Sequence, residues 1–261
     1  MSITIPSEHS RSVLPDDGET ARATKRIVLT MGGKGGTGKT TLMTALAEWY
    51  QEHLLPFVLL DLDTENKARG SVSHFFRERA QKVNIHTPAG LDAFVDHLVG
   101  AEDKLVLADM GAGSGQVATQ WFEEVYEDVA AAGIVFTAIG LVTPDSASVE
   151  SVLSWAHRLQ RRVSYLIVEN HPTEHADLGY WRDAAQADQF REVFQPAVMQ
   201  MDFRLPGLEN AARQHGVTLG QVANRQTPVQ ELSKASFVMR AQGYRRKLFA
   251  EFDRVQELLL P

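Results

Sequence analysis

The segment with the clearest chemical signature is residues 33–41, which read GKGGTGKTT. It fits the pattern G-x-x-x-x-G-K-[ST], in which glycines let the backbone curl so that successive N–H groups point inward at a polyphosphate. Lys39 is predicted to reach the β- and γ-phosphates, and Thr40 to offer its hydroxyl to Mg²⁺. The residues predicted to contact the nucleotide here are Gly33, Lys34, Gly35, Gly36, Thr37, Gly38, Lys39, Thr40 and Thr41.

The residues on either side have the pattern that such a loop requires. The apolar run at 27–29 predicts a strand before the loop, and the periodic stretch at 42–50 predicts a helix after it. A helix N-terminus adds its positive dipole end to the phosphate site. The alternative is a glycine-rich turn that matches the pattern by chance, but the flanking strand and helix favour a phosphate-binding loop.

Acidic residues follow two continuous apolar runs. Residues 57–60 (FVLL) end at Asp61, with Asp63 two positions on, and residues 105–108 (LVLA) end at Asp109. Such runs predict buried parallel strands, whose carboxyl ends are where open α/β sheets bind ligands. Carboxylates at these ends predict that Asp109 holds Mg²⁺ through a water and that Asp61 and Asp63 face a cation or a water. Capping aspartates in polar loops are the alternative.

Short apolar runs alternate with helical patterns along the rest of the chain. This alternation predicts an α/β fold with a doubly wound, mostly parallel sheet and helices on both faces, as in P-loop NTPases. Residues 1–24 are expected to be a mobile tail and 25–261 a single ATPase domain, and residues 143–146 are expected to cap the next helix. The further strands are expected at 133–141, 165–168 and 197–201, and the further helices at 91–99, 115–129, 146–160, 180–193, 208–215 and 244–259.

Composition narrows the function class. The chain has 261 residues, of which 44% are hydrophobic and 23% charged, as expected of a soluble globular protein, and no apolar run approaches the ~20 residues that span a bilayer. A cytoplasmic location is expected, with nucleoid association as a variant. The absence of cysteine excludes disulfides, thiol chemistry and iron–sulfur ligation. The net charge of −7 argues against wholesale nucleic-acid coating but leaves room for a local basic patch.

Lys34 narrows the range of P-loop proteins that this chain resembles. A lysine at the second position of the loop, in the form KGGTGKT, resembles the deviant Walker A motif of the ParA/MinD family of P-loop ATPases. The resemblance implies that Lys34 crosses a dimer interface to the partner's nucleotide, as an arginine finger does, and acts in catalysis with Lys39. It also implies that Asp63 orients or activates the attacking water while Asp61 supports the Mg²⁺ shell. Thr64 and Glu65 replace the family's common Pro-Gln. A solvated loop lysine is the alternative for Lys34.

The resemblance covers residues 25–224. It implies that Asn170 recognises the adenine edge and that a loop containing Pro206 covers the base, although Asn170 is also a common turn residue. It implies cofactors ATP and Mg²⁺, an ATP-sandwich homodimer, a stimulating adaptor protein and slow hydrolysis that positions or segregates a cargo, either plasmid or chromosome DNA or a protein assembly. The alternatives are an ATPase of a plasmid-stability or conjugation module, MinD-like membrane-associated positioning, a metabolic P-loop ligase or kinase, and a non-catalytic ATP-gated binding module.

Two sequence features bear on the surface that such a dimer binds. Basic residues form two groups that are candidates for non-specific DNA contacts, or else solvated surface. The last predicted helix has an apolar stripe with charges nearby, which suits a membrane-surface helix; but with no linker before it, an ordinary docked helix is favoured and membrane binding is not expected. The candidate DNA contacts are Arg158, Arg161, Arg162, Arg240, Arg245, Arg246 and Lys247.

Overall fold

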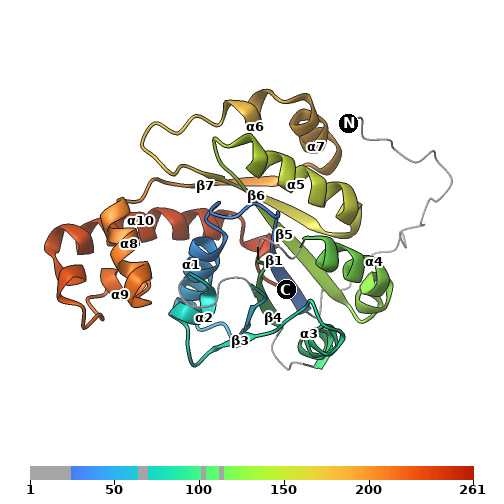
Figure 1. Ribbon diagram of the computed structural model, residues 1–261, viewed down its shortest axis with the longest axis horizontal. Helices are drawn as coiled ribbons and strands as arrows, with labels where there is room; N and C mark the ends of the chain where they lie inside the picture. The colour runs from blue at the N-terminus through green and yellow to red at the C-terminus, as the bar shows by residue number, and fades with distance from the viewer. Residues whose placement is uncertain (1–24, 64–69, 101–103, 112–114) are drawn as a thin grey trace.

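The computed structural model describes residues 25–63, 70–100, 104–111 and 115–261 (Figure 1). In this part of the chain seven strands pair in parallel in one sheet, in the order β3-β2-β4-β1-β5-β6-β7, which confirms the predicted fold class. From β1 the chain goes out to β2 and β3 and then returns to β4, which lies between β2 and β1. It next crosses to β5 on the other side of β1, so the carboxyl edge of the sheet beside β1 is the topological switch point. The strands are β1 (Lys25–Met31), β2 (Val58–Asp61), β3 (Ala80–Lys82), β4 (Leu105–Asp109), β5 (Ile134–Val142), β6 (Ser164–Asn170) and β7 (Ala197–Met201).

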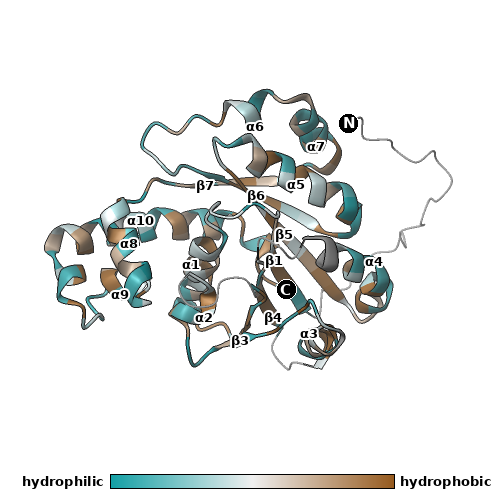
Figure 2. Cartoon of the chain, viewed as in Figure 1, coloured by the Kyte–Doolittle hydropathy of each residue, from teal (hydrophilic) through white to brown (hydrophobic). Residues whose placement is uncertain are grey.

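Helices cover both faces of this sheet. Side chains from one face pack with α1 (Lys39–Glu52), α2 (Val72–Phe75) and the second half of α10 (Ala235–Arg254). Side chains from the other face pack with the remaining helices that follow strands, and Figure 2 shows the central strands as predominantly hydrophobic. Because both faces are buried, the strands need continuous apolar runs, which is why they could be predicted. These helices are α3 (Pro88–Gly100), α4 (Gly115–Ala131), α5 (Ser146–Leu159), α6 (Gly179–Asp183) and α7 (Ala185–Phe194).

A third apolar cluster lies beyond the sheet. It joins α8 (Pro206–His215), α9 (Leu219–Ala223) and the first half of α10, on the far side of α1 from the centre of the sheet (Figure 1). We call this unit the C-terminal lobe, residues 206–242. Glu48 of α1 connects to it by accepting hydrogen bonds from the Thr218 hydroxyl and from the Gly220 N–H at 3.1 Å. The burial of Glu48 raises its pKa. The lobe is therefore fixed to the helix that carries the phosphate-binding loop.

The element predictions differ from the structure where the pattern is short or interrupted. Residues 180–193 form two helices, α6 and α7, because Ala184 is extended (φ −73°, ψ 126°). The last helix begins at Ala235 and ends at Arg254. The elements α2, β3 and α9 were not predicted, since each has five residues or fewer and too little periodicity. Asp145 caps α5 by accepting from the Ala147 N–H, which confirms the expected cap. The predictions for residues 1–24 and for Thr64 and Glu65 lie outside the described residues.

The fold predicts opposite effects for two glycine-to-alanine changes. A β-carbon on Gly140 in β5 would lie 2.7 Å from Met31 Cε and 2.8 Å from Val152 Cγ1, so Gly140→Ala should lower the free energy of unfolding by about 1–3 kcal/mol. A β-carbon on Gly243, within α10, meets no atom within 4 Å, so Gly243→Ala should raise it by about 0.5–1 kcal/mol. Urea unfolding of both variants measures the two values. Equal stability of the two variants would contradict the packing described here.

Candidate active site

The glycine-rich loop lies between β1 and α1, at the carboxyl edge of the sheet. Gly32, Gly36 and Gly38 have φ angles of +99°, +75° and +96°, a region that other residues rarely adopt. A β-carbon on Gly38 would lie 2.9 Å from Asn170 Nδ2 and 3.0 Å from Met201 Cε. Glycine at this position therefore lets the loop turn and also lets the ends of β6 and β7 approach it.

Side chains from two later elements fix the backbone of this loop. The Gly33 N–H donates to Ser151 Oγ of α5 at 2.5 Å. The side-chain amide of Asn170, at the end of β6, donates to the Thr37 carbonyl at 2.8 Å. The loop is thus held in its curled form by the sheet and by α5. Asn170 lies against the loop, and its amide N–H₂ donates to a protein partner; its predicted contact with adenine stays a prediction.

Lys39 lies at the first position of α1 and is buried, with 8% of its surface exposed. Its ammonium donates to the Lys34 carbonyl at 2.8 Å, which places it inside the curl of the loop. Burial lowers the pKa of Lys39, while the carboxylates of Asp109 and Asp63 act in the opposite direction. The charge of this lysine is therefore partly desolvated, which strengthens its attraction for a phosphate.

Asp109 faces the loop from the end of β4. Its carboxylate accepts a hydrogen bond from the Thr40 hydroxyl at 2.7 Å and one from the Thr30 hydroxyl at 3.4 Å. Burial raises the pKa of Asp109 to about 7, and the nearby Asp61 and Asp63 carboxylates act in the same direction. A carboxylate this far desolvated among like charges is stabilised by a cation.

Asp61 and Asp63 follow β2, which pairs with β4 so that Asp61 lies opposite Asp109. The two oxygens of the Asp61 carboxylate accept the backbone N–H groups of Asp63, at 3.2 Å, and of Ser73, at 3.3 Å. Asp61 thus holds the turn that carries Asp63. Asp63 is 7% exposed and lines the cavity described below.

The oxygen atoms of Thr40, Asp61, Asp63 and Asp109 fit a Mg²⁺ ion that binds together with the phosphates of a nucleotide. Among the described residues, no three acidic or histidine side chains are grouped as a metal site by themselves. Mg²⁺ is usually held by one or two protein ligands together with substrate phosphates and waters, rather than by an all-protein cage. Thr40 would hold the ion directly, with Asp109 behind it and Asp61 and Asp63 nearby, as the sequence predicts.

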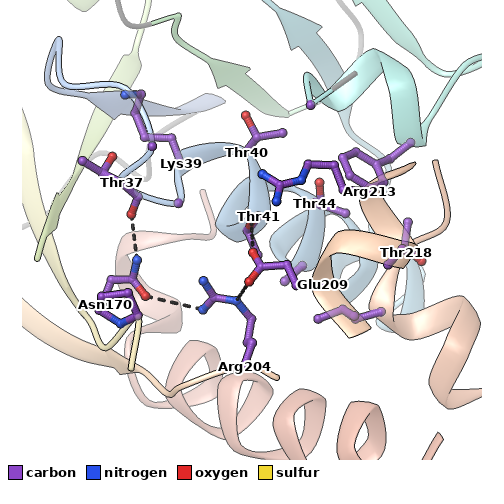
Figure 3. Close-up of a pocket in the computed structure, with 18 of the residues that line it drawn as sticks. Thr37, Lys39, Thr40, Thr41, Thr44, Asn170, Arg204, Glu209, Arg213 and Thr218 are labelled. Carbon is purple, nitrogen blue, oxygen red and sulfur yellow. Dashed lines mark hydrogen bonds and ion pairs between the residues drawn. The ribbon is translucent and has the colours of Figure 1, made fainter. Parts of the chain in front are cut away.

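A cavity of about 500 Å³ opens from the loop along one side of α1. Residues 35–41 and Asn170 line one end, with Arg204 next to Asn170, and side chains from the C-terminal lobe line the other end (Figure 3). Thr41, Thr44 and Glu48 lie at helical spacing along the side of α1 that faces it. This volume lies within the range of small-molecule and cofactor sites.

Polar side chains of this cavity contact one another, as Figure 3 shows. Arg204 approaches Asn170 Oδ1 at 3.4 Å and forms an ion pair with Glu209 at 3.3 Å. Glu209 Oε1 in turn accepts a hydrogen bond from the Thr41 hydroxyl at 3.3 Å. The side chain of Arg204 is 7% exposed, so this ion pair is well shielded from water. A continuous row of contacts thus runs from Asn170, which also donates to the Thr37 carbonyl, through Arg204 and Glu209 to Thr41.

Several residues of the cavity were not found by sequence reasoning. Pro206, which the resemblance places over the base, is exposed at the first turn of α8 and does not line the cavity. Its neighbours Arg204 and Glu209 do, together with Pro172. Their positions depend on how α8 packs against α1, and no spacing in the sequence signals this.

Lys34 points away from the cavity of its own chain. Its ammonium lies 2.9 Å from Asp145 Oδ2 at the start of α5, where the side chains are 43% and 49% exposed. The ion pair and the Ala147 N–H hold the pKa of Asp145 below its usual value. Sequence reasoning gave Asp145 only a capping role, whereas the structure adds this contact with Lys34.

The candidate DNA-contact residues are mostly engaged with the protein. Arg158 donates to Thr119, Arg161 to the Val193 carbonyl, and Arg162 stacks on Tyr126.

In the second group, Arg245 pairs with Glu52 and Lys247 with Asp202. Within the described part of the chain, Arg240 and Arg246 are exposed and make no ion pair.

The apolar stripe of the last helix is buried. Leu248, Phe249 and Phe252 of α10 pack in the core beside α1, as expected of a docked helix. Of the helices in residues 25–63, 70–100, 104–111 and 115–261, none is both long and apolar enough to cross a membrane.

Comparisons with known proteins agree with this geometry. A family model described as the CobQ/CobB/MinD/ParA nucleotide-binding domain (CbiA) matches residues 28–236. Among solved structures, the MinD cell division protein of Aquifex aeolicus is 14% identical, with a TM-score of 0.52 over 90% of this chain and 98% of that chain. The MinC:MinD cell division protein complex of the same organism is 13% identical, with a TM-score of 0.50 over 90% and 97%. The comparison with curated proteins gave no match. The structural likeness shows the fold, and the family model covers most of the sequence, so this chain belongs to the CobQ/CobB/MinD/ParA nucleotide-binding domain family.

Proposed function

We propose that this protein is a Mg²⁺-dependent ATPase that dimerises around two ATP molecules and hydrolyses them to position or segregate a cargo. Membership of the family supports nucleotide binding, because the family model describes a nucleotide-binding domain. The dimer, the hydrolysis and the cargo are the parts that the proposal adds. Each follows from the placement of a particular side chain.

The position of Lys34 is the observation that best supports a dimer. A second lysine in the loop is of no use to its own nucleotide if it faces outward, and the ammonium of Lys34 lies at Asp145, outside the cavity that Lys39 serves. The Lys34–Asp145 pair is half exposed, and an ion pair so open to solvent contributes little to stability. Lys34 can therefore swing to the phosphates of a partner subunit at low cost. There its charge stabilises the transferring phosphoryl group.

The site residues divide the work of hydrolysis. Lys39 and the loop N–H groups bind the phosphates. Thr40, with Asp109 behind it, would hold Mg²⁺, which would supply positive charge to neutralise the phosphates. Asp63 accepts a hydrogen bond from the attacking water and orients it. The bond from the water oxygen to the γ-phosphorus forms as the bond to the β–γ bridging oxygen breaks, and the bridging oxygen leaves with ADP. Positioning and charge account for most of the catalysis, as in other phosphoryl transfers.

The remaining parts of the proposal concern what the dimer binds. Asn170 contacts the adenine, whose edge offers both a donor and an acceptor to an amide. An adaptor protein stimulates hydrolysis, and the presence of a MinC:MinD complex among the similar structures supports a protein partner. For DNA, Arg240 and Arg246 are the candidate residues that are exposed and make no ion pair within the described part of the chain. Two copies in a dimer would double this patch.

A metabolic ligase or kinase is the competing function. Such an enzyme needs a second cavity or an extension of the first for its acceptor, next to the γ-phosphate. The cavity described here extends along α1 to the C-terminal lobe, where a nucleoside could lie. The outward position of Lys34 also favours the dimer.

Light scattering with no nucleotide, with ADP, and with ATP plus Mg²⁺ tests the proposal. The native chain should be a dimer only with ATP, and Asp63→Ala should hold that dimer because it cannot hydrolyse the nucleotide. Lys34→Ala should weaken the dimer by roughly 10- to 100-fold, as expected for loss of charge-assisted hydrogen bonds. A second series with DNA at increasing salt tests binding by the dimer.

Lys82→Ala is the matched control, because this exposed lysine lies on the edge strand β3, away from the loop. It should dimerise like the native chain. A native chain that stays monomeric in ATP plus Mg²⁺ would contradict the proposal and favour the metabolic alternative.

Gly111 offers a test of the role of Asp63 that removes neither a phosphate ligand nor the Asp63 carboxylate itself. A β-carbon on Gly111 would lie 2.8 Å from Asp63 Oδ1 and 2.9 Å from its Cα, so Gly111→Ala must displace Asp63. Because small displacements of a catalytic group are costly, hydrolysis should slow by roughly 10- to 100-fold. The affinity for ATP should change by less than about threefold, since no phosphate ligand moves.

Steady-state phosphate release and calorimetric titration with ATP measure the two quantities. Gly100→Ala is the control, because a β-carbon on Gly100 at the end of α3 would meet no atom of the described residues within 4 Å. Unchanged hydrolysis by Gly111→Ala would show that the position of Asp63 is unimportant for the reaction.

A further inference from the structure

We propose that Glu209 binds the ribose hydroxyls of the nucleotide and that the protein thereby distinguishes ribonucleotides from 2′-deoxynucleotides. This inference rests on the proposed function, because it requires the phosphates to lie in the glycine-rich loop. It assigns a role to the part of the cavity that the phosphate chemistry leaves unexplained.

The path of a bound nucleotide places its sugar beside Glu209. Thr41 is the last residue of the phosphate-binding loop, and its hydroxyl donates to Glu209 Oε1 at 3.3 Å. The cavity continues from this point between α1 and the C-terminal lobe, where Thr44 and Thr218 line it (Figure 3). A nucleoside joined to phosphates in the loop must enter this continuation, so its ribose passes the Glu209 carboxylate.

A carboxylate suits the sugar better than it suits any other part of the nucleotide. Carboxylate oxygens only accept hydrogen bonds, and the 2′- and 3′-hydroxyls of ribose are adjacent donors. Acidic side chains bind the ribose in the same way in dinucleotide-binding folds. Near the phosphates, by contrast, a lone carboxylate would repel the ligand.

Arg204 offsets the repulsion between the Glu209 carboxylate and the phosphates. Its guanidinium forms an ion pair with Glu209 at 3.3 Å and lies 5.5 Å from the centre of the Tyr244 ring. The pair is neutral as a whole, and the buried Arg204 side chain fixes the direction of the carboxylate. Arg204 is thus a positioning residue for Glu209.

Thr44 provides a second and independent indication of a polar ligand. It lies on α1 beside the cavity, is 7% exposed, and its hydroxyl has no hydrogen-bond partner among the described residues. A buried hydroxyl without a partner is costly, and most such groups in proteins are paired. A sugar or base that fills this part of the cavity would provide the missing partner.

The test is calorimetric titration of the full chain with ATP, 2′-deoxyATP and 3′-deoxyATP in the presence of Mg²⁺. The native chain should bind 2′-deoxyATP at least about tenfold more weakly than ATP, because the deoxy sugar leaves the carboxylate without a donor. Glu209→Gln keeps the shape of the side chain but loses its charge. It should weaken ATP binding by about tenfold and reduce the preference for ribose to less than about threefold.

Glu231→Gln is the matched control, since Glu231 is exposed in the same lobe and lies outside the cavity. It should keep the native preference. Equal binding of ATP and 2′-deoxyATP by the native chain would overturn the inference without any variant and would leave the proposed ATPase intact. An equal loss of both ligands in Glu209→Gln would also overturn it. Failure of the native chain to bind any of these nucleotides would overturn the proposed function as well.

Discussion

The parallel pairing of β1 with β4 is the constraint on which the site depends. It places the loop that follows β1 next to the aspartate that ends β4, so that the Thr40 hydroxyl lies 2.7 Å from the Asp109 carboxylate. The pairing of β2 with β4 then brings Asp61 opposite Asp109 and sets the position of Asp63. Carboxylates are gathered at one point although each is costly to bury. The folded state accepts this cost because the same sheet buries two continuous apolar faces.

The C-terminal lobe gives this general site its particular shape. Its α8 and α9 have their own small apolar core and reach α1 through polar contacts of Glu48, Thr41 and Glu209. These contacts lie along the cavity, so a ligand that fills it touches both the sheet domain and the lobe.

The sheet and the residues gathered around the glycine-rich loop, Asn170 included, could be predicted from the sequence, while the side of the cavity formed by Arg204 and the C-terminal lobe could not. Thr40 and Asp109 belong to local patterns, a glycine loop and an apolar strand that ends in an acid, and the parallel sheet brings such strand ends together. Arg204, Glu209 and Glu48 are in the site because of how separate helices pack, across up to 172 residues in the contact of Glu48 with Gly220. Periodicity reports which side of a helix is apolar and says nothing about which polar side chains of two helices meet. Short elements were missed for a related reason, since packing and not local pattern stabilises them.

The account depends most on the action of Lys34 in the site of a partner subunit, and mixing two inactive variants tests this directly. In a sandwich dimer, a site consists of the loop and Asp63 of one subunit with Lys34 of the other. Lys34→Ala and Asp63→Ala should each hydrolyse ATP poorly. At a protein concentration at which both variants are fully dimeric, an equal mixture should recover about a quarter of the native rate, because half of the dimers are mixed and each mixed dimer holds one complete site. A mixture no more active than its separate components would contradict the account, since Lys34 would then act within its own chain or not at all.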